Sequence, residues 1–290
     1  MKNWAALFIC LGLSSALGCG VPASEGGAPL KESLAADATE LESTVRESQS
    51  NYPKSMMPAF YTPDRTFDWG QDYRYSYPGT FAITAPPSVS VRSPGEWETK
   101  QALLVAWTGN FGDVVGEIVS SAKGVTDVTI VYDSAQSLDD FKYQMQSRGV
   151  YTSGLTYVQL PIQTLWMRDY GPLSVEAGNH LGLVDLRYYP GRLYDDAFPQ
   201  LLSQKWNLNN FRMPLDFEGG NFMSDGAGTC YASTALFERN PGSSESQIRS
   251  YFDRYLGCEQ TVFLAPLYGE GTGHIDMFAK IVTPRTIMLG

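Results

Sequence analysis

The chain has 290 residues, enough for one large domain or two small ones, and 43% of them are hydrophobic while 18% are charged. Its 31 acidic residues outnumber its 21 lysines and arginines, which gives a formal net charge of −10. This balance argues against nucleic acid as a partner, because phosphate binding requires clustered basic side chains. It weakly favours a small cationic ligand, although solubility alone explains the charge equally well.

The N-terminus has the pattern of an export signal over residues 1–18. Lys2 supplies the positive charge, and the apolar run over residues 5–17 is too short to remain as a membrane anchor. Residues 16–19, Ala-Leu-Gly-Cys, resemble a bacterial lipobox and predict lipidation of Cys19, although alanine stands where leucine is usual. We therefore expect an exported protein that is periplasmic or held at a bacterial membrane by its lipid alone.

Three further regions follow the signal. Residues 19–50 are rich in Gly, Ala, Ser and Glu and cannot bury a core, so we expect a flexible tether. Residues 51–93 are rich in Tyr and Pro and are expected to wrap the adjoining domain as irregular chain, with carbohydrate binding as the alternative. The regular domain is expected over residues 94–290.

Strands and helices are predicted to alternate along this domain, which indicates an α/β protein. Strands are expected at 102–107, 128–132, 156–160, 181–189, 261–264 and 278–282, and helices at 113–123, 137–148, 197–206 and 248–256. Asp113 and Ser137 are predicted to cap the first two helices, and Ser244 with Gln247 to form a capping box before the last. A strand-strand-helix unit recurs at uneven spacing, which suits a propeller of α/β modules. No Gly-rich phosphate loop follows the first strand, which argues against a dinucleotide fold.

The cysteines do not indicate a metal site. Cys230 and Cys258 either form a disulfide or remain as two buried thiols, and the composition does not decide between these states. No CxxC motif or histidine-rich cluster is present. We therefore expect neither a metal nor another cofactor.

An Arg-Asp pair, Arg168-Asp169, lies between the apolar run 164–167 and the break Gly171-Pro172. The apolar run is interpreted as the end of a buried strand. Charges placed at such a strand end suit a ligand cleft, because a loop on a rigid strand presents them outward. Taken alone, the pair is more simply interpreted as a salt-bridged surface turn.

Further polar residues beside glycines change this interpretation. Glu218 and Asp225 each adjoin glycine, and His274 precedes Asp276 by two residues. On a strand, residues i and i+2 share a face, so His274 and Asp276 are expected to point into one site. A carboxylate beside a histidine orients the ring and raises its pKa. Several carboxylates with one histidine suit a bound guanidinium whose protons the imidazole moves.

These motifs resemble the bacterial agmatine deiminase and Porphyromonas-type peptidylarginine deiminase family over residues 94–290. The resemblance rests on 166–172 (Trp-Met-Arg-Asp-Tyr-Gly-Pro), 218–221 with 225–229, 273–276 (Gly-His-Ile-Asp) and the opening Gly-Glu-Trp-Glu at 95–98. It implies the pentein fold, a five-bladed α/β propeller. It also implies hydrolysis of a guanidinium to a ureido group and ammonia, without a metal or organic cofactor.

The resemblance assigns expected roles to single residues. Asp169 and Asp276 would hold the guanidinium nitrogens, while His274 would act first as general acid toward the leaving ammonia and then as base for water. The expected substrate-binding residues are Trp166, Arg168, Glu218, Asn221 and Asp225. Trp166 would pack on the substrate. Asp225 has a simpler alternative role, which is to organise its own Asp-Gly turn.

The sequence departs from the family in one respect. The family's nucleophile is a cysteine in a Gly-rich motif beyond the His-Ile-Asp stretch, and no such motif occurs before Gly290. The covalent amidino intermediate requires a thiolate, and we do not expect Cys230 or Cys258 to replace it. We therefore expect an incomplete last blade and guanidinium binding without turnover. A fragment of a longer gene is the simpler explanation, and a non-catalytic protein the other.

Three functional hypotheses follow. The first is a hydrolase of the deiminase family that acts on agmatine or peptidyl-arginine. The second is an exported, catalytically inactive protein that binds guanidinium compounds. The third treats the motifs as structural remnants and assigns surface adhesion or carbohydrate binding to the Tyr-rich segment.

Overall fold

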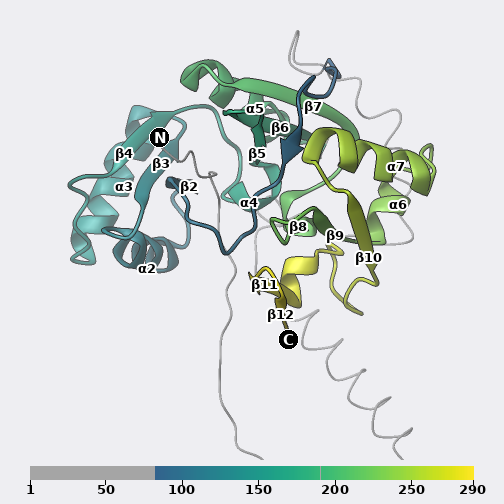
Figure 1. Ribbon diagram of the computed structural model, residues 1–290. Coiled ribbons are helices and arrows are strands. Elements are labelled where there is room, and N and C mark those ends of the chain that lie inside the picture. Colours follow the sequence, from purple (N-terminus) through teal and green to yellow (C-terminus); the bar gives the residue numbers. More distant parts are fainter. Residues whose placement is uncertain (1–81, 190) are drawn as a thin grey trace, which may run out of the picture.

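The structure is a computed structural model that describes residues 82–189 and 191–290. The expected signal, the tether, Cys19 and residues 51–81 of the Tyr/Pro-rich segment lie outside these ranges. Within the ranges, every helix is too short or too polar to cross a membrane. The described chain forms four small sheets with helices packed against them, arranged around the short helix α4 (Met167–Tyr170) (Figure 1).

The first module is a parallel three-stranded sheet in the order β2-β3-β4. Its elements are β2 (Ala102–Ala106), α2 (Gly112–Ala122), β3 (Asp127–Tyr132), α3 (Ala135–Ser147) and β4 (Thr156–Gln159). The strands lie where their apolar runs predicted them. This module nevertheless uses single strand-helix units, whereas paired strands were expected throughout the domain.

The next two modules contain the expected strand-strand-helix unit, in which the two strands are antiparallel. A further strand, which was not part of the expected unit, then lies parallel to the second. The second contains β5 (Leu173–Ala177), β6 (His180–Arg187), α5 (Leu193–Trp206) and β7 (Asn209–Asp216). The third contains β8 (Met223–Ser224), β9 (Thr229–Ser233), α6 (Ala235–Arg239), α7 (Glu245–Tyr251), the π-helical turn η3 (Phe252–Leu256) and β10 (Gln260–Leu264). A last hairpin pairs β11 (Ala279–Thr283) with β12 (Thr286–Leu289).

The segment that precedes the first module lies along the second. β1 (Val91–Arg92) pairs with β5 in antiparallel orientation. Thr84 exchanges two hydrogen bonds with the backbone of Arg212 on β7, and Ser93 donates to Leu256 O at 2.7 Å. Residues 82–93 therefore join the second module to the third.

The helix caps differ from the sequence prediction at two of three positions. Helix α2 begins after Phe111, which has a left-handed φ of 55° and no side-chain cap, so Asp113 lies inside the first turn. Helix α3 begins earlier than predicted because Ser134, rather than Ser137, accepts the capping bond. The capping box of Ser244 and Gln247 is confirmed.

A buried ion cluster fixes β7 against its neighbours. Arg212 on β7 donates to Asp185 of β6 at 2.9 Å and to Asp196 of α5 at 2.9 and 3.0 Å. All three side chains are almost fully buried. Burial raises the pKa of Asp185 to about 6 despite the opposing charge of Arg212. The cluster matters for the site because the chain leaving β7 carries Glu218.

The structure resolves the alternative that the sequence left open for the cysteines. Cys230 on β9 and Cys258 after η3 form a disulfide that closes a span of 28 residues. Both residues are buried in the core between the second and third modules.

Removing this cross-link should destabilise the protein. In the loop-entropy description, a closed loop of this length contributes about 3–4 kcal/mol. We expect the double substitution Cys230→Ala, Cys258→Ala to lower the free energy of unfolding by about that amount in urea titrations. Dithiothreitol should reproduce the loss in the unsubstituted protein and leave the variant unchanged. Equal stability of the two proteins, with and without reductant, would contradict the assignment.

Candidate active site

Three segments from different parts of the chain bring polar side chains together near the centre of the molecule. Asp169 belongs to α4, Glu218 follows β7 directly before the turn η2 (Gly219–Asn221), and His274 precedes the turn η4 (Ile275–Met277). The three residues are 5%, 1% and 4% exposed, so water has little access to them. Charged groups this deeply buried require partners, because desolvation disfavours an isolated charge.

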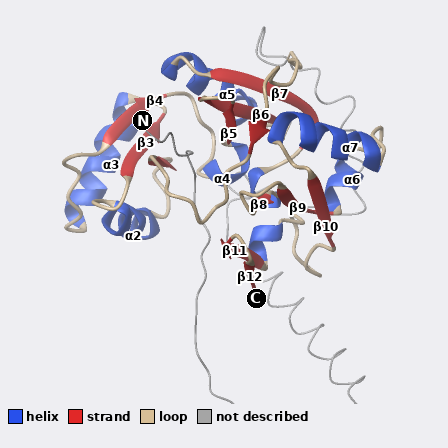
Figure 2. Cartoon of the chain, in the orientation of Figure 1, coloured by secondary structure: helices blue, strands red, loops and turns tan. Residues whose placement is uncertain are grey.

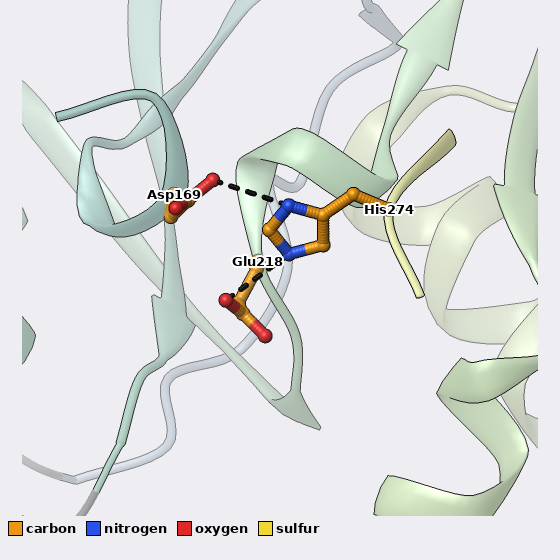
Figure 3. Close-up of side chains that lie close together, drawn as sticks. All are labelled: Asp169, Glu218 and His274. Atoms are coloured by element: carbon orange, nitrogen blue, oxygen red, sulfur yellow. Dashed lines mark ion pairs between the residues drawn. The ribbon is translucent and has the colours of Figure 1, made fainter. Parts of the chain in front are cut away.

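The imidazole of His274 lies between two carboxylates (Figure 3). Its Nδ1 is 3.6 Å from Oδ1 of Asp169, and its Nε2 is 3.1 Å from Oε2 of Glu218. Oδ1 of Asp276 is 4.0 Å from the same Nδ1. Asp169 and Asp276 therefore face one edge of the ring, while Glu218 faces the other edge.

Helix α4 aims Asp169 at this ring. Residues 164–167 were expected to end a strand, but Met167 begins a single helical turn instead. Met167 and Tyr170 are three residues apart and both are buried in one core cluster, which a helical turn allows and a strand does not. The Tyr170 hydroxyl donates to Thr164 O at 2.9 Å, and Gly171 ends the turn.

Glu218 is held by two residues that sequence reasoning missed. The Tyr189 hydroxyl donates to Oε1 of Glu218 at 2.5 Å, and the guanidinium of Arg239 from α6 pairs with the same carboxylate. Arg239 also donates to the Tyr189 hydroxyl at 2.7 Å. This arrangement balances the charge of Glu218 and fixes its position. Neither Tyr189 nor Arg239 belongs to a recognisable motif, so only the structure identifies them.

Asp276 reaches the site by a route different from the one predicted. Alternation along a strand was expected to align it with His274, but residues 275–277 form a 3₁₀ turn. The turn still places Asp276 near the ring and brings its Oδ2 to 3.4 Å from Nε of Arg168. The two residues therefore share the site for a different geometric reason.

An ion-pair chain connects Asp276 to the surface. Nη2 of Arg168 donates to Oε1 of Glu96 at 2.5 Å, and Nζ of Lys280 donates to the other oxygen of Glu96 at 2.5 Å. The Glu96 side chain is 3% exposed. This chain explains the opening Gly-Glu-Trp-Glu motif structurally, because Glu96 joins the start of the domain to α4 and β11.

Burial and neighbouring charges shift the pKa values of three carboxylates, raising two of them and lowering the third. Burial raises the pKa of Asp169, and nearby Asp276 adds to the rise while His274 opposes it. Burial also raises the pKa of Asp276 against the opposing charge of Arg168. Burial would raise the pKa of Glu96 too, but Arg168 and Lys280 outweigh it and lower that pKa.

The other three predicted binding residues also have structural contacts. Trp166 is half-buried against the core cluster that contains Tyr170. The Asn221 side chain accepts a hydrogen bond from Ser233 N at 2.7 Å and ties η2 to β9. Asp225 accepts from Ala227 N and Thr229 N at 2.7 and 3.0 Å, which is the turn role left open by the sequence.

The cluster contains a possible metal-ligand set, which the sequence did not predict. Among the described residues, one ligand atom each from Asp169, Glu218 and His274 lies within 4.8 Å of the others. The two carboxylates, however, face different nitrogens of the ring, whereas an imidazole ligates an ion through one nitrogen. Arg239 already balances Glu218. The donor set therefore fits an imidazole oriented between two carboxylates better than a metal ligand.

Comparison with known proteins points to one family. The family described as Porphyromonas-type peptidyl-arginine deiminase matches residues 92–290. A putative agmatine deiminase of Photobacterium profundum is 28% identical over 232 residues, covering 71% of this chain and 62% of the relative. One from Mycoplasma mycoides subsp. mycoides is 26% identical over 216 residues, covering 68% and 59%. The chain thus spans about 60% of the length of these curated relatives.

Solved structures show the same fold. The agmatine deiminase of Enterococcus faecalis matches with a TM-score of 0.62 at 22% identity, covering 71% of this chain and 62% of that one. The putative arginine deiminase of Porphyromonas gingivalis matches with a TM-score of 0.56 at 20% identity, covering 68% and 64%. The expected pentein-type α/β propeller is therefore confirmed. Fold alone does not establish the reaction.

Gly220 provides a test of the ring position. A Cβ at this residue would lie 2.4 Å from Nδ1 of His274 and 2.7 Å from Oδ1 of Asp169. We expect Gly220→Ala to move the ring away from Asp169 and to cost about 1–3 kcal/mol of stability. NMR of the imidazole signals should show a shifted His274 and an unshifted His180. Gly242→Ala is the matched control, because its Cβ would meet nothing within 4 Å. An unchanged His274 signal in Gly220→Ala would contradict the close approach.

Glu96 provides a test of the ion-pair chain. Glu96→Gln leaves Arg168 and Lys280 without their common carboxylate and should destabilise the protein by at least about 2 kcal/mol. Because the folded protein holds the pKa of Glu96 below its ordinary value of 4.5, the stabilisation is fully present above pH 4.5 and is lost as the pH falls through the folded-state pKa. Urea titrations across this range should show the two proteins converging in acid. Equal stability of the unsubstituted protein and Glu96→Gln at neutral pH would contradict this role of Glu96.

Proposed function

The chain belongs to the Porphyromonas-type peptidyl-arginine deiminase family, and we propose that its buried site binds the guanidinium group of agmatine or of an arginine-containing peptide and handles its protons. One observation carries the proposal. Asp169 and Asp276, from separate segments, face the same edge of the His274 ring. Two carboxylates on one side of an imidazole match a planar cation that offers several N–H donors.

The electrostatics support a cationic ligand. Burial raises the pKa of both aspartates, so each carboxylate is costly to keep charged without a further cation beside it. A bound guanidinium would favour the charged forms and form charge-assisted hydrogen bonds with them. Arg168 already lies beside Asp276, so the ligand would share that carboxylate with a resident guanidinium. Asp169 faces the imidazole and is the better first contact.

His274 is the proposed proton carrier. Replacing a guanidinium nitrogen by oxygen breaks one C–N bond, and the leaving ammonia needs a proton that His274 donates. The same ring then accepts a proton from the water that supplies the oxygen. Glu218 faces the opposite nitrogen and, itself held by Arg239 and Tyr189, keeps the ring oriented through both steps.

The covalent step requires a further group. The deiminase route attaches the amidino carbon to a thiolate before water releases it. The two cysteines of the described residues are bonded to each other, so neither offers a thiolate. We therefore assign binding and proton transfer to these residues, and we assign the covalent step to neither Cys230 nor Cys258.

A second candidate is an exported guanidinium-binding protein without catalytic turnover. The disulfide favours it in two ways, since it occupies both cysteines of the described ranges and since such bonds persist mainly in oxidising compartments. The N-terminal signal pattern supports the same location. Both candidates use the same binding site and differ only in turnover.

Calorimetry with agmatine and a blocked arginine peptide tests the shared binding site. The protein should bind at least one of them, and Asp169→Asn should weaken binding about tenfold or more, since it removes a charge-assisted hydrogen bond. Asp139→Asn, an exposed carboxylate of α3, is the matched control. An ammonia assay on the same samples should show no turnover. Folded protein that binds neither ligand would contradict the proposed binding site. Ammonia release would contradict the assignment of the covalent step.

A further inference from the structure

Glu270 lies just outside the Gly-Thr-Gly-His motif, yet its carboxylate holds the backbone of that motif. Oε1 accepts from Thr272 N at 2.9 Å and from the Thr272 hydroxyl at 2.7 Å. Oε2 accepts from Gly273 N at 2.6 Å and from His274 N at 3.2 Å. Three consecutive backbone N–H groups therefore converge on one side chain.

The conformation of Gly273 makes this convergence geometrically feasible. Its φ is +72°, in the left-handed region, and a Cβ there would lie 2.5 Å from Cβ of Ala235. Successive N–H groups in such a turn form a concave nest that binds anions. The carboxylate of Glu270 occupies this nest as an internal anion, with charge-assisted hydrogen bonds that are stronger than neutral ones.

The carbonyl side of the same loop is also fixed. Arg239 donates to Thr272 O at 3.2 Å, and the Ser233 hydroxyl donates to Gly273 O. Arg239 is the residue that pairs with Glu218. The loop that carries His274 is thus held from one side by Glu270, and from the other by the residue that holds Glu218.

We propose that Glu270 is a positioning residue that sets the direction of the His274 ring between Asp169 and Glu218. The role assumed for His274 rests on the proposed function, but the placement of the ring does not. Glu270 acts through the backbone, because its bonds reach the N–H of His274 rather than the imidazole. Without its charge, the three N–H groups lose their shared anionic acceptor, and only the His274 N–H keeps a second partner, the Thr272 hydroxyl at 3.3 Å, so the turn relaxes. The charged groups facing the ring are Asp169 and Glu218 from other segments and Asp276 from the turn that follows His274, with Arg239 behind Glu218.

The chain contains only two histidines, which makes the ring directly observable. NMR of the imidazole C–H signals should give one buried signal for His274 and one for the exposed His180, which serves as an internal reference. In Glu270→Gln one acceptor oxygen becomes an NH₂ group facing backbone N–H donors. We expect the His274 signal to shift, the His180 signal to remain, and agmatine to bind about tenfold more weakly or worse, the scale seen when a supporting residue behind a functional group is removed.

Glu117→Gln is the matched control, since it removes the same charge from an exposed position of α2 and should change nothing. Glu270→Asp retains the charge on a shorter side chain and should give an intermediate shift. If Glu270→Gln does not fold, this variant carries the test. In the unsubstituted protein, Gly273 N–H should exchange slowly with solvent. An unshifted His274 in the folded variants, or rapid exchange at Gly273, would overturn the proposal.

These outcomes separate the two claims. If the unsubstituted protein binds neither agmatine nor a blocked arginine peptide, the proposed function fails, while the His274 signal still decides the role of Glu270. If agmatine binds and Glu270→Gln leaves both its affinity and the ring signal unchanged, the proposed function stands and the positioning role fails.

Discussion

The placement of one imidazole between carboxylates is the constraint on which the rest of the centre depends. His274 is nearly buried, and Asp169 and Glu218 occupy opposite edges of its ring. Buried charges are tolerated only when each has partners, because the interior does not replace the hydration they lose. This requirement accounts for the surrounding residues: Arg239 and Tyr189 hold Glu218, while Arg168 and Glu96 support Asp276. The site is therefore a connected network rather than a set of independent side chains.

The modular fold brings Asp169, Glu218 and His274 together at one place. The centre lies where α4, the end of β7 and the turn before β11 approach each other, with the sheets around them (Figure 2). Close approach is possible because Gly219 and Gly220 lack side chains: a Cβ on Gly219 would lie 2.0 Å from the backbone oxygen of Arg168. The glycines of the Glu-Gly-Gly-Asn motif are thus explained by contact between segments. The sheets form a rigid scaffold, and the short turns between them carry the side chains of the site.

Of the described strands, the sequence predicted β2, β3, β4, β6, β10 and β11, and it missed β1, β5, β7, β8 and β9 as well as the short turns. Continuous apolar runs such as 102–107 and 128–132 are long enough to mark buried strands. Helix α4 and the turn η4 contain four and three residues, too few to display a repeating hydrophobic pattern, and tertiary contacts determine their form. Motifs predicted that Asp169, Glu218, Asp225, His274 and Asp276 gather in one site. The structure brings four of them together, while Asp225 accepts hydrogen bonds within its own turn. Tyr189, Arg239 and Glu270 have no motif, and their importance appears only when distant segments are placed together.

The most direct test of the account is a crystal structure of the protein with agmatine bound. The account predicts a guanidinium plane lying against the edge of His274 that Asp169 and Asp276 share, with both carboxylates within hydrogen-bond distance of its nitrogens. Agmatine bound elsewhere, or held at this site through its amine while both aspartates contact only protein groups, would contradict it.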